Sequence, residues 1–252
     1  MNIVFDIGGT NMRVAAAYDG ELGEIRKVPT PQDPKQGIAL LVQIVKELSQ
    51  GTPEKIAGDV PGSIDGEGRL DALNLPLWEG MKVAEEVSRA LDVPTQVFND
   101  AVLIGYGEAR GGGGKGFARV VYMTVSTGFG GALVKDDLAK SPLLGSEFPE
   151  LKPRIEAQIS GTAVRKKFGI HPKDLDSLDE RNKLADILAE GLAEIYETWK
   201  PDVFVIGGSM IVGVNPIPLE RVREKFTAVP VKMAELGDNG GLIGGAILAM
   251  QK

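Results

Sequence analysis

Two glycine-rich turns, each between apolar strand-like segments, constrain the fold of this chain most strongly. Residues 6–13 read DIGGTNMR and lie between the apolar runs 2–5 and 14–18. Residues 118–135 read ARVVYMTVSTGFGGALVK, so a strand at 120–125 leads into STGFGG and a returning strand at 132–134. Glycine-rich turns between such runs are typical of β-hairpins. Two similar hairpins far apart in one chain indicate two related halves that face a shared cleft.

The polar residues of these turns suit an anionic ligand. Gly8 and Gly9 let the backbone bend tightly and approach a ligand, and their amides, with the Thr10 hydroxyl, can cradle a phosphate. Asp6, at the end of the first strand, can hold a hydrated Mg²⁺. On this turn alone, an ordinary hairpin with a polar tip explains the residues equally well. A third glycine-rich turn, Gly207-Gly208-Ser209, follows the apolar strand 202–206.

Composition excludes several classes of protein. The 252 residues permit one large or two modest domains, and a hydrophobic content of 43% supplies a sizeable core. A net charge of -7 argues against nonspecific nucleic-acid binding. No apolar run approaches ~20 residues, so no membrane span is expected, and the first residues lack the pattern of a signal peptide. The chain has no Cys, which fits a reducing cytoplasm and leaves neither disulfides nor thiolate metal sites.

Strand and helix patterns alternate along the chain, which predicts an α/β architecture. Strands are expected at 2–6, 13–18, 22–28, 55–60, 95–98, 120–125, 132–134, 202–206 and 229–233, and helices at 35–50, 80–91, 101–110, 153–168, 179–200, 217–226 and from about 240. The run at 111–116 reads GGGGKG and formally matches a dinucleotide fingerprint. It precedes a strand instead of opening a helix, so we interpret it as a flexible connection between domains.

With these turns in place, the chain resembles the ROK family of sugar kinases, within the actin-like and hexokinase-like ATPases. DIGGTNMRV and STGFGG resemble its two phosphate loops and VIGGSM its nucleotide-side turn. VPGSID at 60–65 and NLPLWEG at 74–80 resemble its sugar-side loops, and DNGGLIGGAILA at 238–249 its closing segment. The resemblance implies two actin-like, ribonuclease-H-like α/β domains with a central cleft. The smaller would comprise 1–110 with 238–252, and the larger 111–237.

The same resemblance implies a cytoplasmic kinase whose partners are small molecules, a sugar and a nucleotide. It would transfer the γ-phosphoryl group of Mg-ATP to a hydroxyl of a hexose, with the glucose 6-hydroxyl expected first. A homodimer is the family expectation, and no nucleic-acid or membrane partner is expected. Asp100 would be the catalytic base and Asp6 would hold Mg²⁺ through water. Sugar would be bound by Gly62, Ser63, Asn74, Asn99, Glu147, Glu150 and Glu156. The nucleotide phosphates and ribose would be bound by Gly8, Gly9, Thr10, Asn11, Arg13, Thr127, Gly128, Gly130, Gly207, Gly208 and Ser209.

Asp100 also has a purely structural interpretation. It follows strand 95–98 and precedes a helical segment, so from local sequence a helix N-cap is favoured over a base. Its place at the C-terminal end of a strand, where ligands bind in open α/β sheets, supports the base. The chain lacks the GxxxxGK[ST] pattern, which excludes a Walker-type kinase.

The clearest departure from the family lies between 136 and 161. Most ROK proteins carry a His and three Cys there that bind a structural zinc, whereas this chain has no Cys and its one His is His171, so no structural zinc is expected. Glu147 matches the family's Glu, and Glu150 stands in place of its His. For Glu150 a solvated acidic face is an equal alternative. The departure leaves open a catalytically silent sensor. The short length and the reduced zinc loop also leave polyphosphate open as the phosphoryl donor, although the chain lacks an obvious Lys/Arg run to hold a polyanion, which favours ATP. An actin-like assembly protein is a third alternative, and the sugar-side loops argue against it.

Overall fold

The computed structural model describes residues 1–49, 51–72 and 74–251, and its contacts divide the chain into two compact units. Unit 1 comprises Met1–Gly107 and Asp238–Lys252, and unit 2 comprises Glu108–Gly237. The chain therefore passes between the units twice, inside an α-helix at 107/108 and inside the short 3₁₀ helix Gly237–Asn239 at 237/238. Both units are α/β, as the alternating pattern predicts.

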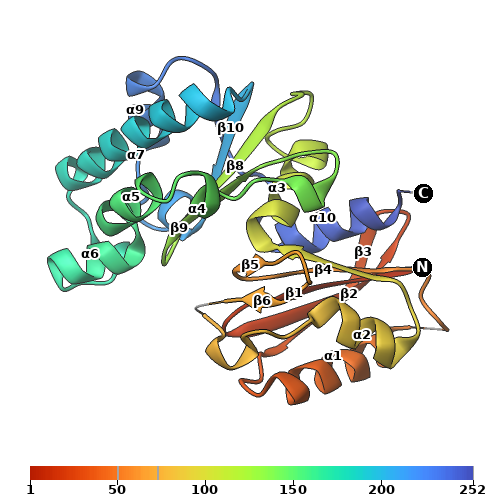
Figure 1. The fold of residues 1–252 in the computed structure, drawn as a ribbon. Coiled ribbons are helices and arrows are strands. Elements are labelled where there is room, and N and C mark those ends of the chain that lie inside the picture. Colours follow the sequence, from red (N-terminus) through yellow and green to blue (C-terminus); the bar gives the residue numbers. More distant parts are fainter. Residues whose placement is uncertain (50, 73, 252) are drawn as a thin grey trace. The chain divides into compact units, whose positions relative to one another are not determined.

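Unit 1 is built on a mixed sheet with strands in the order β3-β2-β1-β4-β7 (Figure 1). The first three strands form an antiparallel meander, and β4 and β7 run parallel to β1. The hairpin predicted from DIGGTNMR is confirmed. The elements of unit 1 are β1 (Asn2–Ile7), β2 (Asn11–Tyr18), β3 (Glu21–Pro29), α1 (Pro34–Leu48), β4 (Ile56–Val60), β5 (Ser63–Ile64), β6 (Leu70–Asp71), α2 (Val83–Leu91), β7 (Thr95–Asn99), α3 (Asp100–Gly111, which continues into unit 2) and α10 (Gly240–Ala249).

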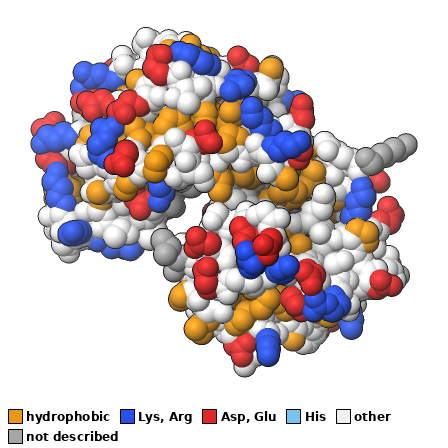
Figure 2. Space-filling model, in the orientation of Figure 1, with side chains coloured by type: hydrophobic (Ala, Val, Ile, Leu, Met, Phe, Trp, Pro, Cys, Tyr) orange, Lys and Arg blue, Asp and Glu red, His pale blue; other side chains and the backbone are white. Residues whose placement is uncertain are grey.

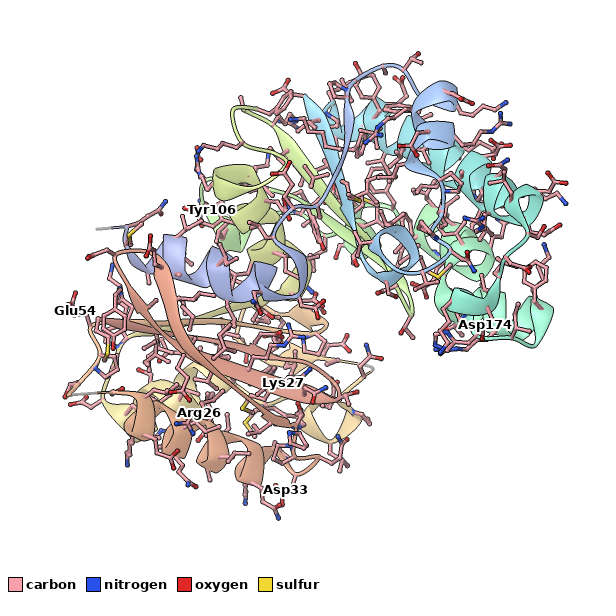
Figure 3. The ribbon with its side chains drawn as sticks, turned by 180° about the vertical axis from the view of Figure 1, so that it is seen from behind. Arg26, Lys27, Asp33, Glu54, Tyr106 and Asp174 are labelled. Atoms are coloured by element: carbon pink, nitrogen blue, oxygen red, sulfur yellow. The ribbon has the colours of Figure 1, made fainter. Side chains whose placement is uncertain are left out.

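Helices cover both faces of this sheet. Alternate residues of β1 point to opposite faces: Phe5 joins the core under α1 and α2, whereas Val4 packs with Leu242 of α10. Figure 1 shows α1 and α2 on one side of the sheet and α10 on the other. Asp33, visible at the start of α1 in Figure 3, caps that helix by accepting a hydrogen bond from the Lys35 amide (2.8 Å).

Unit 2 is built on a second mixed sheet, in the order β11-β10-β8-β9, and the hairpin predicted from STGFGG is confirmed. Strands β8, β10 and β11 are parallel, and their apolar side chains pack with α5 and α7 in one core. The elements of unit 2 are β8 (Val120–Val125), β9 (Phe129–Leu133), α4 (Leu144–Glu147), α5 (Leu151–Ile159), α6 (Gly161–Phe168), α7 (Leu178–Trp199), β10 (Val203–Gly207), α8 (Ser209–Val212), α9 (Leu219–Lys225) and β11 (Val231–Met233).

The helix predicted at 153–168 is wrong, because Ser160 interrupts it. Its backbone is extended (φ -68°, ψ 158°), and it ends α5 and begins α6. The Ser160 hydroxyl accepts a hydrogen bond from the Ala163 amide (3.1 Å), as an N-cap does. Apolar side chains continue at helical spacing on both sides of the break, so the sequence pattern conceals it.

The glycine run at 111–116 is a hydrogen-bonded turn, which corrects the interpretation as a flexible connection. Gly112, Gly113 and Gly114 are buried around the side chain of Glu108, which is 0% exposed. The Glu108 carboxylate accepts hydrogen bonds from the amides of Gly113 (2.8 Å), Glu235 (2.9 Å) and Leu236 (2.8 Å). A Cβ at Gly112 would lie 2.1 Å from the Glu108 Oε2 atom. The glycines therefore let the backbone wrap around a buried carboxylate.

The surface carries mixed charge. Figure 2 shows Lys and Arg side chains interspersed with Asp and Glu on the visible face. Among the described residues, no helix is both long and apolar enough to cross a lipid bilayer.

Candidate functional site

Asn99 and Asp100 lie where β7 ends and α3 begins. The Asn99 Oδ1 atom accepts hydrogen bonds from the amides of Ala101 (2.9 Å) and Val102 (3.3 Å). Its Nδ2 atom donates to the carbonyl of Gly62 (2.5 Å). Asn99 therefore caps the helix and fixes the 61–64 loop at the same time. Asp100 also accepts from the Ala101 amide through Oδ1 (2.8 Å), but the capping contact to the second amide belongs to Asn99.

Asp100 has an environment that suits a general base. Burial raises the pKa of Asp100 from 3.8 to about 6, and the Asp6 carboxylate nearby adds to this, against the opposing hydrogen bonds from Ala101 and Asn99. A carboxylate with a pKa near 6 is still ionised at neutral pH and is a stronger base than an ordinary Asp. Perturbed pKa values of this kind concentrate at functional sites.

Asp59 is a site residue that the sequence analysis missed. It lies on β4 opposite Asp6 of β1 in a parallel pair, so both side chains point to the same face of the sheet. Asp59 is 1% exposed, and its Oδ2 atom has no hydrogen-bond partner among the described residues. Burial, with the neighbouring Asp6 and Asp100 carboxylates, raises the pKa of Asp59 well above its usual range. The signal was present in the sequence as a charged residue within the apolar strand 56–60.

Asp6 is half-buried and has one basic neighbour. Its Oδ2 atom lies 3.5 Å from the Arg13 guanidinium, which also lies 3.8 Å from the exposed Asp238. Burial raises the pKa of Asp6, and the hydrogen bond with Asp59 and the charge of Arg13 oppose that rise.

The carbonyl groups of the first glycine turn accept hydrogen bonds from within unit 1. The Gly8 amide donates to the Asn11 carbonyl (2.9 Å), and Thr30 donates to the Gly8 carbonyl through its hydroxyl (2.7 Å) and to the Thr10 carbonyl through its amide (2.9 Å). In the described part of the chain, the amides of Gly9 and Thr10 have no acceptor. This arrangement leaves donors at the tip of the turn, as an anion-binding site requires.

Of the predicted sugar-side positions, Asn74 lies against the first glycine turn and Gly62 lies against Asp71 and Asn99. Gly62 has a φ of +99°, and a Cβ there would lie 2.0 Å from the Asp71 carbonyl, so only glycine fits without movement. The carbonyl of Asn74 lies 3.1 Å from the position of a Cβ on Gly9, while Ser63 begins β5. The sequence-predicted site residues Asp6, Gly8, Gly9, Thr10, Asn11, Arg13, Gly62, Ser63, Asn74, Asn99 and Asp100 all belong to unit 1.

Unit 2 carries the second glycine turn, which is fixed from two helices. The Gly161 amide, at the start of α6, donates to the Ser126 carbonyl (2.7 Å), and Thr162 donates to the Thr127 carbonyl through its amide (3.2 Å) and hydroxyl (2.9 Å). The Ser209 amide donates to the Ser126 Oγ atom (3.0 Å). Within the described residues, the amides of Thr127 and Gly128 have no acceptor, so this tip also presents free donors.

Gly208 connects the third turn to the second. Its φ is +92°, and a Cβ there would lie 2.4 Å from the Val125 carbonyl and 2.7 Å from the Thr124 hydroxyl. Gly207 is buried at the end of β10, and Ser209 begins α8. The sequence-predicted residues Thr127, Gly128, Gly130, Gly207, Gly208 and Ser209 thus all lie at adjoining turns of unit 2.

The three glutamates predicted to bind sugar differ from one another. Glu156 accepts a hydrogen bond from the Phe129 amide (2.9 Å) through Oε2, which also lies 3.0 Å from the Lys152 ammonium. It therefore holds the second turn in place. Glu147 and Glu150 are exposed. His171 begins a short 3₁₀ helix, where its Nδ1 atom accepts from the Lys173 amide (3.2 Å).

A divalent cation fits the donor set of unit 1. The carboxyl groups of Asp6, Asp59 and Asp100 lie near one another, and the Arg13 guanidinium lies near the first two, so acidic groups outnumber basic ones there. In the described part of the chain, no three His, Cys, Asp or Glu side chains are arranged to enclose a metal ion. Mg²⁺ commonly binds through one or two carboxylates, with waters and substrate phosphates as its other ligands. Asp6 with Asp59 matches that requirement.

Residues 2–141 match the model of the ROK family. The chain is 30% identical to the bifunctional enzyme NanE/NanK of Brucella melitensis over 98% of its own length, and it spans about half (53%) of that protein. It is 26% identical to the N-acetyl-D-glucosamine kinase of Pectobacterium atrosepticum, with 97% of each chain covered.

Among solved structures, a ROK family glucokinase from Streptomyces griseus, in complex with glucose and AMPPNP, superposes with a TM-score of 0.72. The two share 21% sequence identity, with 98% of each chain covered, so the likeness is one of fold. The architecture is the α/β fold of actin-like ATPases. Together with the match over residues 2–141, these similarities identify the chain as a member of the ROK family.

Proposed function

We propose that the chain is a sugar kinase that transfers the γ-phosphoryl group of ATP to a hydroxyl of a hexose. The observation that carries the proposal is Asp100, a carboxylate with a pKa raised to about 6 at the C-terminal end of a parallel strand. Proteins similar to this chain support the reaction class. They include an N-acetyl-D-glucosamine kinase and a glucokinase whose structure contains glucose and AMPPNP.

In this mechanism Asp100 accepts the proton of the attacking hydroxyl as the oxygen bonds to the γ-phosphorus and ADP leaves. Each unit offers its own donors for phosphate oxygens, the amides of Gly9 and Thr10 in unit 1 and those of Thr127 and Gly128 in unit 2. Asn99 orients the base by fixing the start of α3 and the Gly62 loop. A divalent cation bound by Asp6 would offset phosphate charge.

We propose glucose as the acceptor, phosphorylated at its 6-hydroxyl. Glu156, Glu147 and Glu150 are the candidates for further sugar contacts, because carboxylates accept hydrogen bonds from hydroxyl groups. Glu156 has one oxygen engaged by Phe129 and Lys152, so its Oε1 atom is the one that would accept from a sugar.

The test is a coupled ADP-release assay with Mg-ATP and glucose, mannose, fructose, N-acetylglucosamine or N-acetylmannosamine. Polyphosphate is tested in parallel by direct detection of sugar phosphate. We expect sugar-dependent turnover that Asp100→Asn reduces at least about 10²-fold, the range of a lost general base. Asp19→Asn, a change of the same charge at an exposed carboxylate of unit 1 whose φ of +50° Asn also tolerates, serves as the matched control and should retain normal turnover. Absence of product from folded protein with every donor and sugar would refute the kinase and favour a binding protein.

A further inference from the structure

Asp59 is a buried carboxyl group that the proposed phosphoryl transfer does not use. We propose that Asp59 and Asp6 together form a site for a divalent cation, with Asp59 as the second protein ligand beside Asp6. The inference rests on the proposed function only for the cation's role with ATP, because cation binding itself can be measured without nucleotide or sugar.

The geometry of the sheet places the two carboxyl groups as a pair. Asp6 and Asp59 are direct partners in the parallel pairing of β1 with β4, on the face covered by α10. Their side chains lie within hydrogen-bonding reach of each other. Adjacent ligands of an octahedral Mg²⁺ at 2.0–2.1 Å are separated by roughly 2.9 Å, which is also a hydrogen-bonding separation. One ion can therefore contact both groups with little movement.

One carboxyl oxygen of Asp59 is buried without a hydrogen-bond partner among the described residues. The residue is 1% exposed, and the oxygen is its Oδ2 atom. Burial of a carboxyl oxygen without a partner destabilises the folded state, and buried carboxylates are commonly paired with a cation or a metal. The nearest guanidinium, Arg13, lies 3.5 Å from Asp6 and is shared with Asp238. A divalent ion would balance the excess negative charge.

The first turn of α10 is shaped around this group. A Cβ on Gly241 would lie 2.2 Å from the Asp59 Oδ2 atom and 3.1 Å from its Cγ atom. Glycine at 241 therefore allows a helix to pack directly over a polar group inside the sheet–helix interface. An apolar residue at 59 would fill this interface without an unpaired oxygen, so the carboxyl group is a feature that packing alone does not explain.

The test is titration of the nucleotide-free protein with Mn²⁺, followed by the electron paramagnetic resonance signal of the free ion. We expect one site per chain, and at least tenfold weaker binding in Asp59→Asn and in Asp6→Asn. Asp238→Asn is the control, because it removes a carboxylate from the surroundings of Arg13 at a side chain that is 93% exposed. Screening by solvent should keep its effect within about twofold.

Binding of Mn²⁺ to Asp59→Asn with the wild-type affinity would overturn the proposal, as would absence of binding to the wild-type protein. Circular dichroism establishes that each variant is folded. If Asp59→Asn does not fold, anomalous scattering from Mn²⁺-soaked wild-type crystals decides: an ion bonded to both carboxyl groups supports the site, and an ion bonded to Asp6 alone overturns it. A site that depends on Asp59 in a protein without kinase activity would refute the proposed function and leave this inference standing.

Discussion

Replacing Asp100 by Asn should make the protein more stable while it removes activity. The folded state raises the pKa of Asp100 from 3.8 to about 6, so the folded protein binds this proton more tightly than the unfolded chain does. A shift of this size corresponds to about 3 kcal/mol. Because this pKa is raised, ionised Asp100 lowers the free energy of unfolding at neutral and alkaline pH. The destabilisation disappears as pH falls below 6 towards the pKa of the unfolded chain. Asn has nearly the same shape, and its Oδ1 atom can still accept from the Ala101 amide.

The expected gain in unfolding free energy is therefore up to about 3 kcal/mol at pH 8 and well under 1 kcal/mol near pH 4. Urea denaturation of both proteins at pH 8, 6 and 4 measures this difference directly. The wild-type enzyme should also lose kcat/KM about tenfold per pH unit below pH 6, because the base becomes protonated. A gain that is equal at all three pH values, or no gain at pH 8, would refute the reasoning that burial sets the Asp100 pKa.

Other positions give independent tests. Glu156→Ala should raise the KM for nucleotide, because it releases the Phe129 amide at the second turn, and also the KM for sugar, because it removes the proposed Oε1 acceptor; an unchanged KM for sugar in steady-state kinetics would exclude Glu156 as a sugar ligand. Gly208→Ala should destabilise the protein by about 1–3 kcal/mol and weaken nucleotide binding, since a Cβ there meets the Val125 carbonyl at 2.4 Å; an unchanged Tm and calorimetric affinity would contradict this. Ser160→Ala should cost about 1 kcal/mol in urea denaturation through loss of the α6 cap, whereas Ser160→Asn, which can still cap, should cost less.

The hairpins and the alternating elements could be predicted because their signals are local. Glycine turns between apolar runs specify hairpins without information from the rest of the chain. The break at Ser160 could not be predicted in the same way, since Ile159 and Ala163 continue a helical pattern of buried residues across it. What separates α5 from α6 is the need to place the Gly161 amide on the Ser126 carbonyl, a contact between segments 35 residues apart.

The site was predictable where one residue carries the signal, and not where several segments combine. Asn99 and Asp100 were found together, but which of them caps α3 depends on the placement of the Gly62 loop, to which Asn99 donates. Asp59 was missed, although it is a charged residue within an apolar strand, because that local signal does not say which other groups the side chain faces. Its importance comes from the register of β4 beside β1 and from Gly241 in the last helix, both of which are tertiary features.

The two glycine hairpins are alike in sequence but differ in the charge around them. At the first, Asp6 and the buried Asp59 exceed the charge that Arg13 supplies, so the surroundings favour a cation. At the second, Glu156 is offset by Lys152 at 3.0 Å and by the Phe129 amide, so the free amides of the turn are left to favour an anion. Side chains from other segments thus give two similar backbone turns opposite electrostatic surroundings.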